Sequence, residues 1–252
     1  MNTVRRFQIF QVEPVENNKF DQMLEGIESE IISDGFVILP ERIMRDPVPV
    51  NDGDVFNRLT ELSRHITLIA GSMLVRDQDS IYNRTYVFNH GRQVGYQDKI
   101  VPFAREKSRL SPGRVIKVFT VSGLTFTVAV CYDIDFPFYA KLSAINGARM
   151  IFNPSLIRSD FHQEWHTYIK ARSLENRINI ISVNSMHEFF KGDSLSVSPY
   201  IESDAVRLET EEYGLKYSAI LNTELKDVDD KYRSRIAEDP GVYSFPVKKV
   251  ID

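Results

Sequence analysis

Short apolar runs alternate along this chain with segments of helical periodicity, and this alternation is the strongest constraint on its fold. Phe36-Val-Ile-Leu39 is a continuous apolar run, which is typical of a strand covered on both faces. Residues 17–33, just before it, carry apolar side chains at helical spacing: Phe20, Met23, Leu24, Ile27 and Ile31. A helical pattern over 55–65 and a buried strand over 66–74 follow. This rhythm indicates an α/β protein.

Two turn signals in the middle of the chain predict hairpins. Asn89-His90-Gly91-Arg92 separates strands over 81–88 and 93–97, and Ser122-Gly123 separates strands over 115–121 and 124–130. The other expected elements are a strand over 5–12, a helix over 138–146, a strand over 149–153, a helix over 161–177, strands over 178–184, 194–197, 205–210 and 216–221, and a short charged helix over 227–235.

Composition narrows the class of protein. The 252 residues contain no linker or repeat, so we expect one domain over residues 1–252. A net charge of −4 with both signs interspersed argues against nucleic-acid binding. No apolar run approaches the ~20 residues that span a bilayer, and the first residues lack the apolar core of a signal peptide. A single cysteine fits a reducing cytoplasm, where we expect the protein to reside.

That cysteine, Cys131, follows a buried strand and precedes two acids, Pro137 and a helical run. The pattern predicts an exposed thiol at a strand-to-helix corner, close to the positive end of a helix dipole, which lowers a thiol pKa. Such a thiol suits a nucleophile. The alternative is a buried structural cysteine, because free cysteine is among the most buried residue types. This stretch alone favours neither interpretation.

Two more ionisable residues, Glu41 and Lys99, also sit just past predicted strands, where α/β proteins place their sites. Each alone is more typical of a solvated surface. Together with Cys131 they supply the parts that acyl chemistry needs: a base, a positive partner for an oxyanion, and a nucleophile. Their spacing does not establish that they converge.

Several ordered segments resemble motifs of the nitrilase (carbon–nitrogen hydrolase) superfamily, whose hallmark is a Glu-Lys-Cys triad. They run in order from residue 37 to 199 and cover most of the chain. They are Val37-Ile-Leu-Pro-Glu41, Tyr96-Gln-Asp-Lys99-Ile-Val-Pro, Glu106-Lys-Ser-Arg-Leu-Ser-Pro-Gly113, Val130-Cys131-Tyr132-Asp133-Ile134-Asp135-Phe136-Pro137, Lys170-Ala-Arg-Ser-Leu-Glu-Asn176, Val183-Asn184, and the hairpin from Gly192 to Pro199.

The resemblance implies roles for five residues. Glu41 is the general base, Lys99 stabilises the oxyanion and Cys131 is the nucleophile. The backbone N–H of Tyr132 is a second oxyanion donor, and Glu106 orients Lys99 or the substrate. The resemblance also implies a four-layer α-β-β-α sandwich of two mixed sheets with helices on the outer faces. Relatives commonly pair through a helical face, which implies a homodimer or a higher homo-oligomer.

The substrate pocket is expected to include Tyr132, Asn153, Ser155 and Leu156, since the loop after residue 153 lines the pocket in the family. The alternative is that these residues only end the strand and begin the loop, with no role in binding. No cofactor is expected. His162 and His166 are spaced i, i+4 on a predicted helix, as metal ligands can be, but no third ligand is evident. A hydrogen-bonded histidine pair is therefore the favoured interpretation.

Two features beside Cys131 distinguish this chain from many members of the family. Many relatives have Arg where Asp135 stands and Glu where Phe138 stands, so an ion pair beside the nucleophile is absent here. The dipeptide Cys-Tyr, in place of Cys-Trp-Glu, favours an amidase-like branch over true nitrilases. On the helix expected over 161–177, Arg172 and Glu175 are spaced i, i+3 and are expected to form an ion pair.

The prediction for function is a hydrolase that cleaves a non-peptide C–N bond of a small amide or carbamoyl compound. The reaction passes through a cysteine thioester and releases ammonia or an amine. One alternative is a catalytically weak member of the same fold that binds a small molecule or a protein, which the altered Asp135 and Phe138 suggest. Another is a nitrilase or acyltransferase that uses the same triad.

Overall fold

The structure, a computed structural model, describes residues 4–32, 34–224 and 244–252. Within these residues the strands form two mixed sheets of seven strands each. The first sheet has the order β13-β1-β2-β4-β5-β6 with β3 beside β4, and it consists of β1 (Val4–Phe10), β2 (Phe36–Ile38), β3 (Val48–Pro49), β4 (Thr67–Asp77), β5 (Ser80–Asn89), β6 (Arg92–Asp98) and β13 (Ser218–Glu224).

The second sheet has the order β12-β11-β10-β9-β8-β7-β14. Its strands are β7 (Ile116–Val121), β8 (Leu124–Val128), β9 (Met150–Pro154), β10 (Asn179–Val183), β11 (Leu195–Glu202), β12 (Ala205–Glu212) and β14 (Val247–Ile251). Each sheet is mixed: its central pairs are parallel, and antiparallel pairs flank them, although the edge strand β14 of the second sheet pairs parallel with β7.

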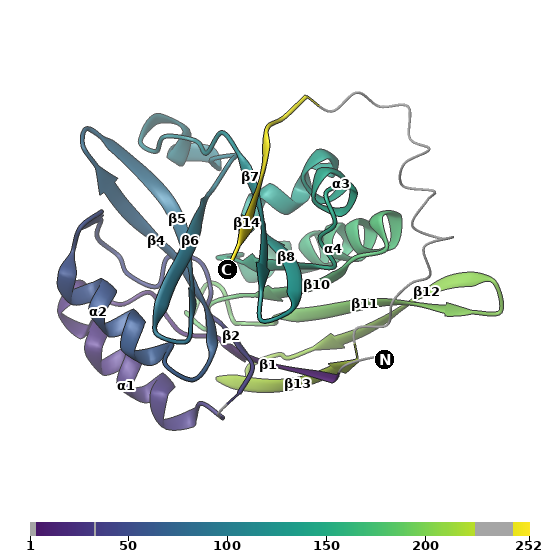
Figure 1. Ribbon diagram of the computed structural model, residues 1–252, viewed down its shortest axis with the longest axis horizontal. Coiled ribbons are helices and arrows are strands. Elements are labelled where there is room, and N and C mark those ends of the chain that lie inside the picture. Colours follow the sequence, from purple (N-terminus) through teal and green to yellow (C-terminus); the bar gives the residue numbers. More distant parts are fainter. Residues whose placement is uncertain (1–3, 33, 225–243) are drawn as a thin grey trace.

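Helices cover the outer face of each sheet (Figure 1). They are α1 (Phe20–Glu30), α2 (Gly53–Leu62), α3 (Pro137–Ile145) and α4 (His162–Asn176), with short 3-10 segments η1 (Asn17–Lys19), η2 (Ala104–Ser108), η3 (Cys131–Asp135) and η4 (Ser159–Phe161). None of the helices in the described ranges is long and apolar enough to span a membrane.

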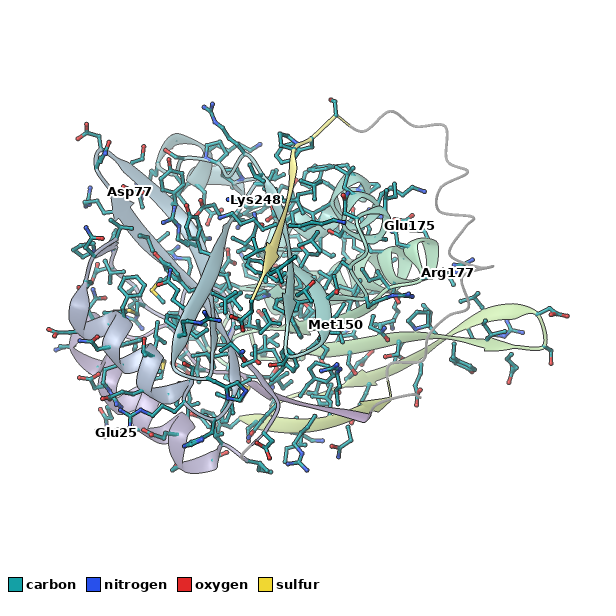
Figure 2. The ribbon with its side chains drawn as sticks, in the orientation of Figure 1. Glu25, Asp77, Met150, Glu175, Arg177 and Lys248 are labelled. Carbon is teal, nitrogen blue, oxygen red and sulfur yellow. The ribbon has the colours of Figure 1, made fainter. Side chains whose placement is uncertain are left out.

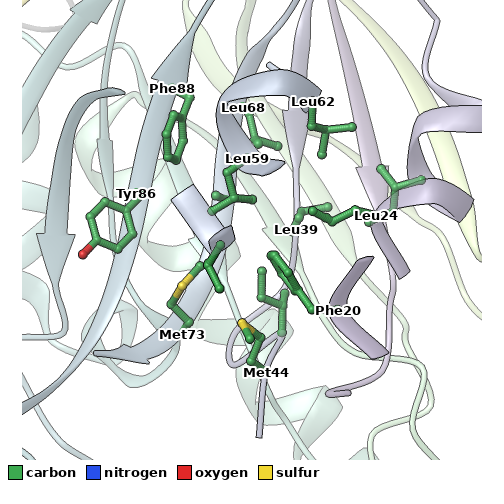
Figure 3. Close-up of a cluster of buried hydrophobic side chains, with 14 of the residues drawn as sticks. Phe20, Leu24, Leu39, Met44, Leu59, Leu62, Leu68, Met73, Tyr86 and Phe88 are labelled. Atoms are coloured by element: carbon green, nitrogen blue, oxygen red, sulfur yellow. The ribbon is translucent and has the colours of Figure 1, made fainter. Parts of the chain in front are cut away.

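Three apolar clusters separate the layers. Phe20 and Leu24 of α1 and Leu59 of α2 pack on Leu68 and Phe88 of the first sheet (Figure 3). An equivalent cluster joins α3 and α4 to the outer face of the second sheet.

The third cluster lies between the two sheets. Phe36 of the first sheet lies 6.1 Å from Phe126 and 5.9 Å from Phe152 of the second, between ring centroids. Figure 2 shows Met150 inside the molecule and Glu25 pointing away from α1. The predicted four-layer α-β-β-α sandwich is therefore confirmed.

Both predicted hairpins form, and their turns explain the sequence signal. His90 and Gly91 have φ of 46° and 76°, and Ser122 and Gly123 have φ of 48° and 70°. Two successive positive φ values are typical of the two-residue turns that match the twist of a hairpin. The sequence interpretation missed β3, β14 and the antiparallel pairing of β4 with β5. The charged helix expected over 227–235 falls outside the described residues.

Three strand ends meet at one place between the sheets. Glu41 follows β2, Lys99 follows β6 and Cys131 follows β8. The Glu41 N–H donates to the carbonyl oxygen of Ser155, 3.2 Å away, and this bond ties the first sheet to the second. The topology thus brings residues from distant parts of the sequence to the same end of the sandwich.

A bulge in β4 supports the Glu41 strand end. The pairing of β4 with β5 shifts register between Ala70 and Met73, and Gly71 in that gap has φ of 41°. A Cβ on Gly71 would lie 2.1 Å from the carbonyl oxygen of Pro40, the residue before Glu41. Only glycine fits both the backbone conformation and this contact.

We therefore expect Gly71→Ala to lower the free energy of unfolding by about 3 kcal/mol, which lowers the melting temperature by about 6 °C or more. Differential scanning calorimetry checks this. Gly53→Ala is the matched control, because Gly53 lies in α2 with open space around its Cα, and alanine there favours the helix. Equal melting temperatures for the two variants would contradict the account.

Candidate active site

A buried ion cluster around Lys99 forms the floor of the site. The Lys99 Nζ lies 2.8 Å from Glu41 Oε1 and 2.9 Å from Glu106 Oε2. Lys99 and Glu41 are each only 3% exposed. Burial by itself lowers the pKa of Lys99, but the charges of Glu41, Cys131 and Glu106 outweigh burial and raise it. Lys99 therefore stays an ammonium.

Asn83 of β5 joins the two carboxylates from the other side. Its Nδ2 donates to Glu41 Oε1 at 2.7 Å and to Glu106 Oε1 at 3.5 Å, and its backbone oxygen accepts the Lys99 N–H at 2.8 Å. Sequence reasoning missed Asn83. The only signal in the sequence was a polar side chain inside a predicted strand. If that strand is buried, the side chain needs a hydrogen-bond partner, which would have indicated a polar site nearby.

Cys131 begins η3, directly beyond the end of β8, with a left-handed φ of 48°. A non-glycine residue in this region stores backbone strain, which is a frequent property of functional residues. The expectation of an exposed thiol is wrong, since Cys131 is 6% exposed.

The expected lowering of its pKa is also wrong. Burial raises the pKa of the Cys131 thiol well above its ordinary value, and the Glu41 carboxylate raises it further. The Lys99 ammonium and the Leu156 N–H oppose this rise without cancelling it. The dipole of α3 does not help, because that helix begins only at Pro137, beyond η3, and a helix dipole acts within about one turn.

Asp133 links the Lys99 loop to the Cys131 turn. Its carboxylate accepts the N–H groups of Ile100 at 3.1 Å, Val101 at 2.7 Å and Val130 at 3.1 Å. Complete burial raises the pKa of Asp133 to about 7, although these three donors and Lys99 hold it lower than burial alone would. The Asp133 side chain thus fixes the backbone of both the Lys99 loop and the Cys131 turn.

Asn153 and Ser155 lie behind Cys131. The Asn153 Nδ2 donates to the carbonyl oxygens of Ala129 at 2.7 Å and Cys131 at 3.1 Å. The Ser155 Oγ donates to Asn153 Oδ1 at 2.9 Å. Both side chains are fully buried. Asn153 therefore contacts the backbone of the Cys131 turn and Ser155 holds Asn153, and neither side chain is among the lining residues of the cavity described next.

A cavity of about 530 Å³ opens over the thiol, and Cys131, Tyr132 and Leu156 are among its lining residues. This volume is in the range of small-molecule sites. Two of the four residues expected to bind substrate, Tyr132 and Leu156, therefore reach the cavity. The arrangement can hold a small molecule against a thiol that has a carboxylate and an ammonium beside it.

The two histidines of α4 are held by hydrogen bonds, as favoured from the sequence. His162 Nδ1 lies 3.1 Å from Asp193 Oδ2, and His166 Nε2 lies 2.9 Å from the Asp193 carbonyl oxygen. Across the described ranges no group of three or more His, Cys, Asp or Glu residues could hold a metal ion. The expected Arg172–Glu175 ion pair is confirmed, at 2.9 Å.

Comparison with known proteins gives the family. The carbon–nitrogen hydrolase family model matches residues 38–221, which include all four residues of the ion and thiol cluster. The chain belongs to the carbon–nitrogen hydrolase family. The two mixed sheets and outer helices described above agree with the fold of solved members of the superfamily.

Curated relatives of this carbon–nitrogen hydrolase share modest identity with it. A hydrolase in the agr operon of Staphylococcus aureus is 29% identical over 160 residues, which are 59% of this chain and 61% of that protein. A nitrilase of Pyrococcus abyssi is 26% identical over 79% of this chain and 78% of its own length. The 2-oxoglutaramate amidase of Bacillus subtilis is 25% identical over 54% of this chain and 55% of its own length. The match thus spans about three fifths of the Staphylococcus aureus hydrolase.

Solved structures share the fold of this carbon–nitrogen hydrolase. A superfamily protein of Xanthomonas campestris with an arsenic adduct in its active site has a TM-score of 0.78 and 17% identity, covering 96% of this chain and 99% of that one. A Glu-to-Gln mutant of an amidase from Nesterenkonia, with the acetamide moiety of fluoroacetamide added covalently at its active-site cysteine, has a TM-score of 0.73 and 16% identity. The alignment covers 95% of this chain and 98% of that one.

The contacts of Asp133 predict a large effect of Asp133→Asn. The new amide group cannot accept all three backbone N–H bonds, so one buried donor loses its partner, at a cost of about 2–3 kcal/mol and a melting temperature lower by about 5 °C. Thermal denaturation measures this. Asp160→Asn is the control, because Asp160 pairs with Arg158 on the surface, where such pairs contribute little. Similar shifts in both variants would contradict the prediction.

The raised pKa of Cys131 predicts how its thiol reacts. As the chain has one cysteine, its reaction with the uncharged reagent dithiodipyridine reports this residue alone. We expect the rate to rise with a midpoint above the ordinary thiol pKa of about 8.5. Glu41→Gln removes a repelling charge and lowers that midpoint by about 1 unit or more. Glu61→Gln, an exposed acid on α2, leaves it unchanged; a common midpoint in all three proteins would refute this electrostatic account.

Proposed function

We propose that this carbon–nitrogen hydrolase cleaves a small amide with Cys131 as nucleophile, through a thioester. The observation that carries the proposal is the position of the only cysteine of the chain, Cys131: its thiol lies beside the buried Glu41–Lys99–Glu106 cluster and also lines a cavity. Base, cation and thiol are the three parts that acyl transfer from an amide requires.

Charge explains how a thiol with a raised pKa can act. The cluster has one net negative charge, because two carboxylates face the Lys99 ammonium. Ionising Cys131 by releasing its proton to water would add a second buried negative charge. Passing the proton from Cys131 to Glu41 leaves the net charge unchanged. Attack is therefore coupled to this local transfer, and Glu41 acts as the general base.

In the first half-reaction, the sulfur forms a bond to the carbonyl carbon of the amide. The oxyanion that develops accepts hydrogen bonds from Lys99 Nζ and from the backbone N–H of Tyr132. Glu41 then returns the proton to the leaving nitrogen, the C–N bond breaks, and ammonia or an amine departs. The product that stays behind is a thioester on Cys131.

In the second half-reaction, Glu41 takes a proton from water as the water oxygen attacks the thioester carbon. The C–S bond breaks, the sulfur recovers a proton and the carboxylic acid leaves. Glu106 takes no proton in this scheme. It orients Lys99, and Asn83 holds both carboxylates in register while the Glu41 proton moves.

The names of relatives support amides as substrates. Relatives include a 2-oxoglutaramate amidase and the omega-amidase of Saccharomyces cerevisiae. A Glu-to-Gln mutant of the Nesterenkonia amidase carries a covalent adduct at its active-site cysteine. A homodimer and a cytoplasmic location stay predictions.

The test uses Cys131→Ala with a panel of small amides. We expect the wild-type protein to release ammonia and the variant to lose at least about 10⁴-fold in kcat. Mass spectrometry of the quenched wild-type protein should detect the acyl group on Cys131. Circular dichroism controls for folding of the variant. A folded Cys131→Ala variant that retains full turnover would rule out the thioester route.

Other outcomes separate the alternatives. Transfer of the trapped acyl group to an added amine, faster than to water, would identify an acyltransferase. Ammonia release from nitriles but not from amides would identify a nitrilase. Binding of amides with neither ammonia release nor an acyl adduct would identify a binding protein.

A further inference from the structure

The cavity over Cys131 has an unusual wall. More than half of its lining residues are aromatic, including Phe136, Trp165 and Tyr168. Two carboxylates, Asp135 and Glu164, line the same cavity. The proposed chemistry uses neither of these acids, so their presence in the cavity needs another explanation.

Both acids, Asp135 and Glu164, influence the hydroxyl group of Tyr168. The Tyr168 hydroxyl donates to Glu164 Oε1 at 3.3 Å, and the charges of Glu164 and Asp135 both raise the pKa of that tyrosine. Burial raises the pKa of Asp135 to about 6, and Glu164 is the next largest cause. The two carboxylates are therefore close enough to repel one another across this part of the cavity.

The cations that face Asp135 are already engaged. Arg172 donates to the carbonyl oxygens of Ile134 and Asp135 and pairs with Glu175. Lys99 pairs with Glu41 and Glu106. These two cations lower the pKa of Asp135, but the balance of burial and Glu164 still raises it.

One cation, Arg158, lines the cavity itself. Its guanidinium is paired with the carboxylate of Asp160 through two bonds, at 3.1 and 2.9 Å. The wall near Asp135 and Glu164 thus presents unneutralised negative charge beside aromatic faces. Aromatic faces attract cations, and carboxylates beside them strengthen that attraction.

We infer that the substrate is an amide whose far end carries a positive charge, such as a short-chain ammonium, with Asp135 and Glu164 as the residues that select it. This inference rests on the proposed amide hydrolysis. The amide group meets Cys131, and the cation lies against the two acids. A substrate with a carboxylate at that end meets repulsion from both acids.

Three amides of similar size test the charge preference: β-alanine amide, which is cationic, butyramide, which is neutral, and succinamate, which is anionic. Binding is measured in Cys131→Ala, which cannot form the acyl adduct. Trp165 lines the cavity and is the only tryptophan, so its fluorescence reports occupancy. We expect the dissociation constant of β-alanine amide to be about tenfold below that of butyramide, with succinamate weakest.

Charge-removing variants identify the residues responsible. Asp135→Asn and Glu164→Gln, each in the Cys131→Ala background, should reduce the ratio between the butyramide and β-alanine amide constants by about threefold, because the two acids share a preference of about tenfold. Glu188→Gln is the matched control, because Glu188 is exposed and does not line the cavity. The preference should also weaken as the pH falls through about 6, where Asp135 gains a proton, and this dependence should vanish in Asp135→Asn.

Equal affinities for the three amides, or tighter binding of succinamate, would overturn the inference. So would a loss in Glu188→Gln as large as in the other variants, because the preference would then reflect the general field of the protein. Ammonia release by the wild-type protein separates this result from the proposed function. Turnover without charge preference overturns only the inference, whereas no turnover of any of the three amides counts against the proposed function.

Discussion

The structure depends on one buried ammonium held between two carboxylates. Lys99, Glu41 and Glu106 come from three separate segments, and each would be costly to bury without the others. The fold meets this cost by bringing Glu41 and Lys99 together at two strand ends, by placing Glu106 of η2 beside them, and by adding Asn83 as a further donor. Burial and the Glu41 carboxylate raise the pKa of the neighbouring Cys131 thiol, so it keeps its proton until a nearby acceptor is available.

Hydrogen bonds to the backbone keep this cluster in place. Asp133 fastens the Lys99 loop to the Cys131 turn, Asn153 binds the carbonyl oxygen of Cys131, and the Glu41 N–H reaches across to Ser155. Polar residues near the nucleophile therefore divide into two groups. One group is wholly buried and positions the backbone, and the other, with Asp135 and Tyr132, faces the cavity.

Much of the architecture could be predicted, for identifiable physical reasons. The residues at His90-Gly91 and Ser122-Gly123 determine the conformation of their turns locally, so both hairpins could be predicted. The motifs around Glu41, Lys99 and Cys131 indicate the type of reaction. The exposure of Cys131 could not be predicted, because it depends on η3 and on the loop at Leu156, which only the folded chain brings together. Asn83 and β14 were missed since a polar residue in a strand, or a lysine-rich strand, resembles a surface segment until its neighbours are known.

The pairing of β1 with β13 has a consequence for how the protein is made. Val4 to Phe10 lie between β2 and a strand that is synthesised more than two hundred residues later. Until β13 leaves the ribosome, one edge of the first sheet has unpaired backbone groups beside apolar side chains such as Phe7 and Ile9. The nascent chain is therefore at risk of aggregation for most of its synthesis, and chaperones that shield strand edges should matter more for its yield than for its final stability.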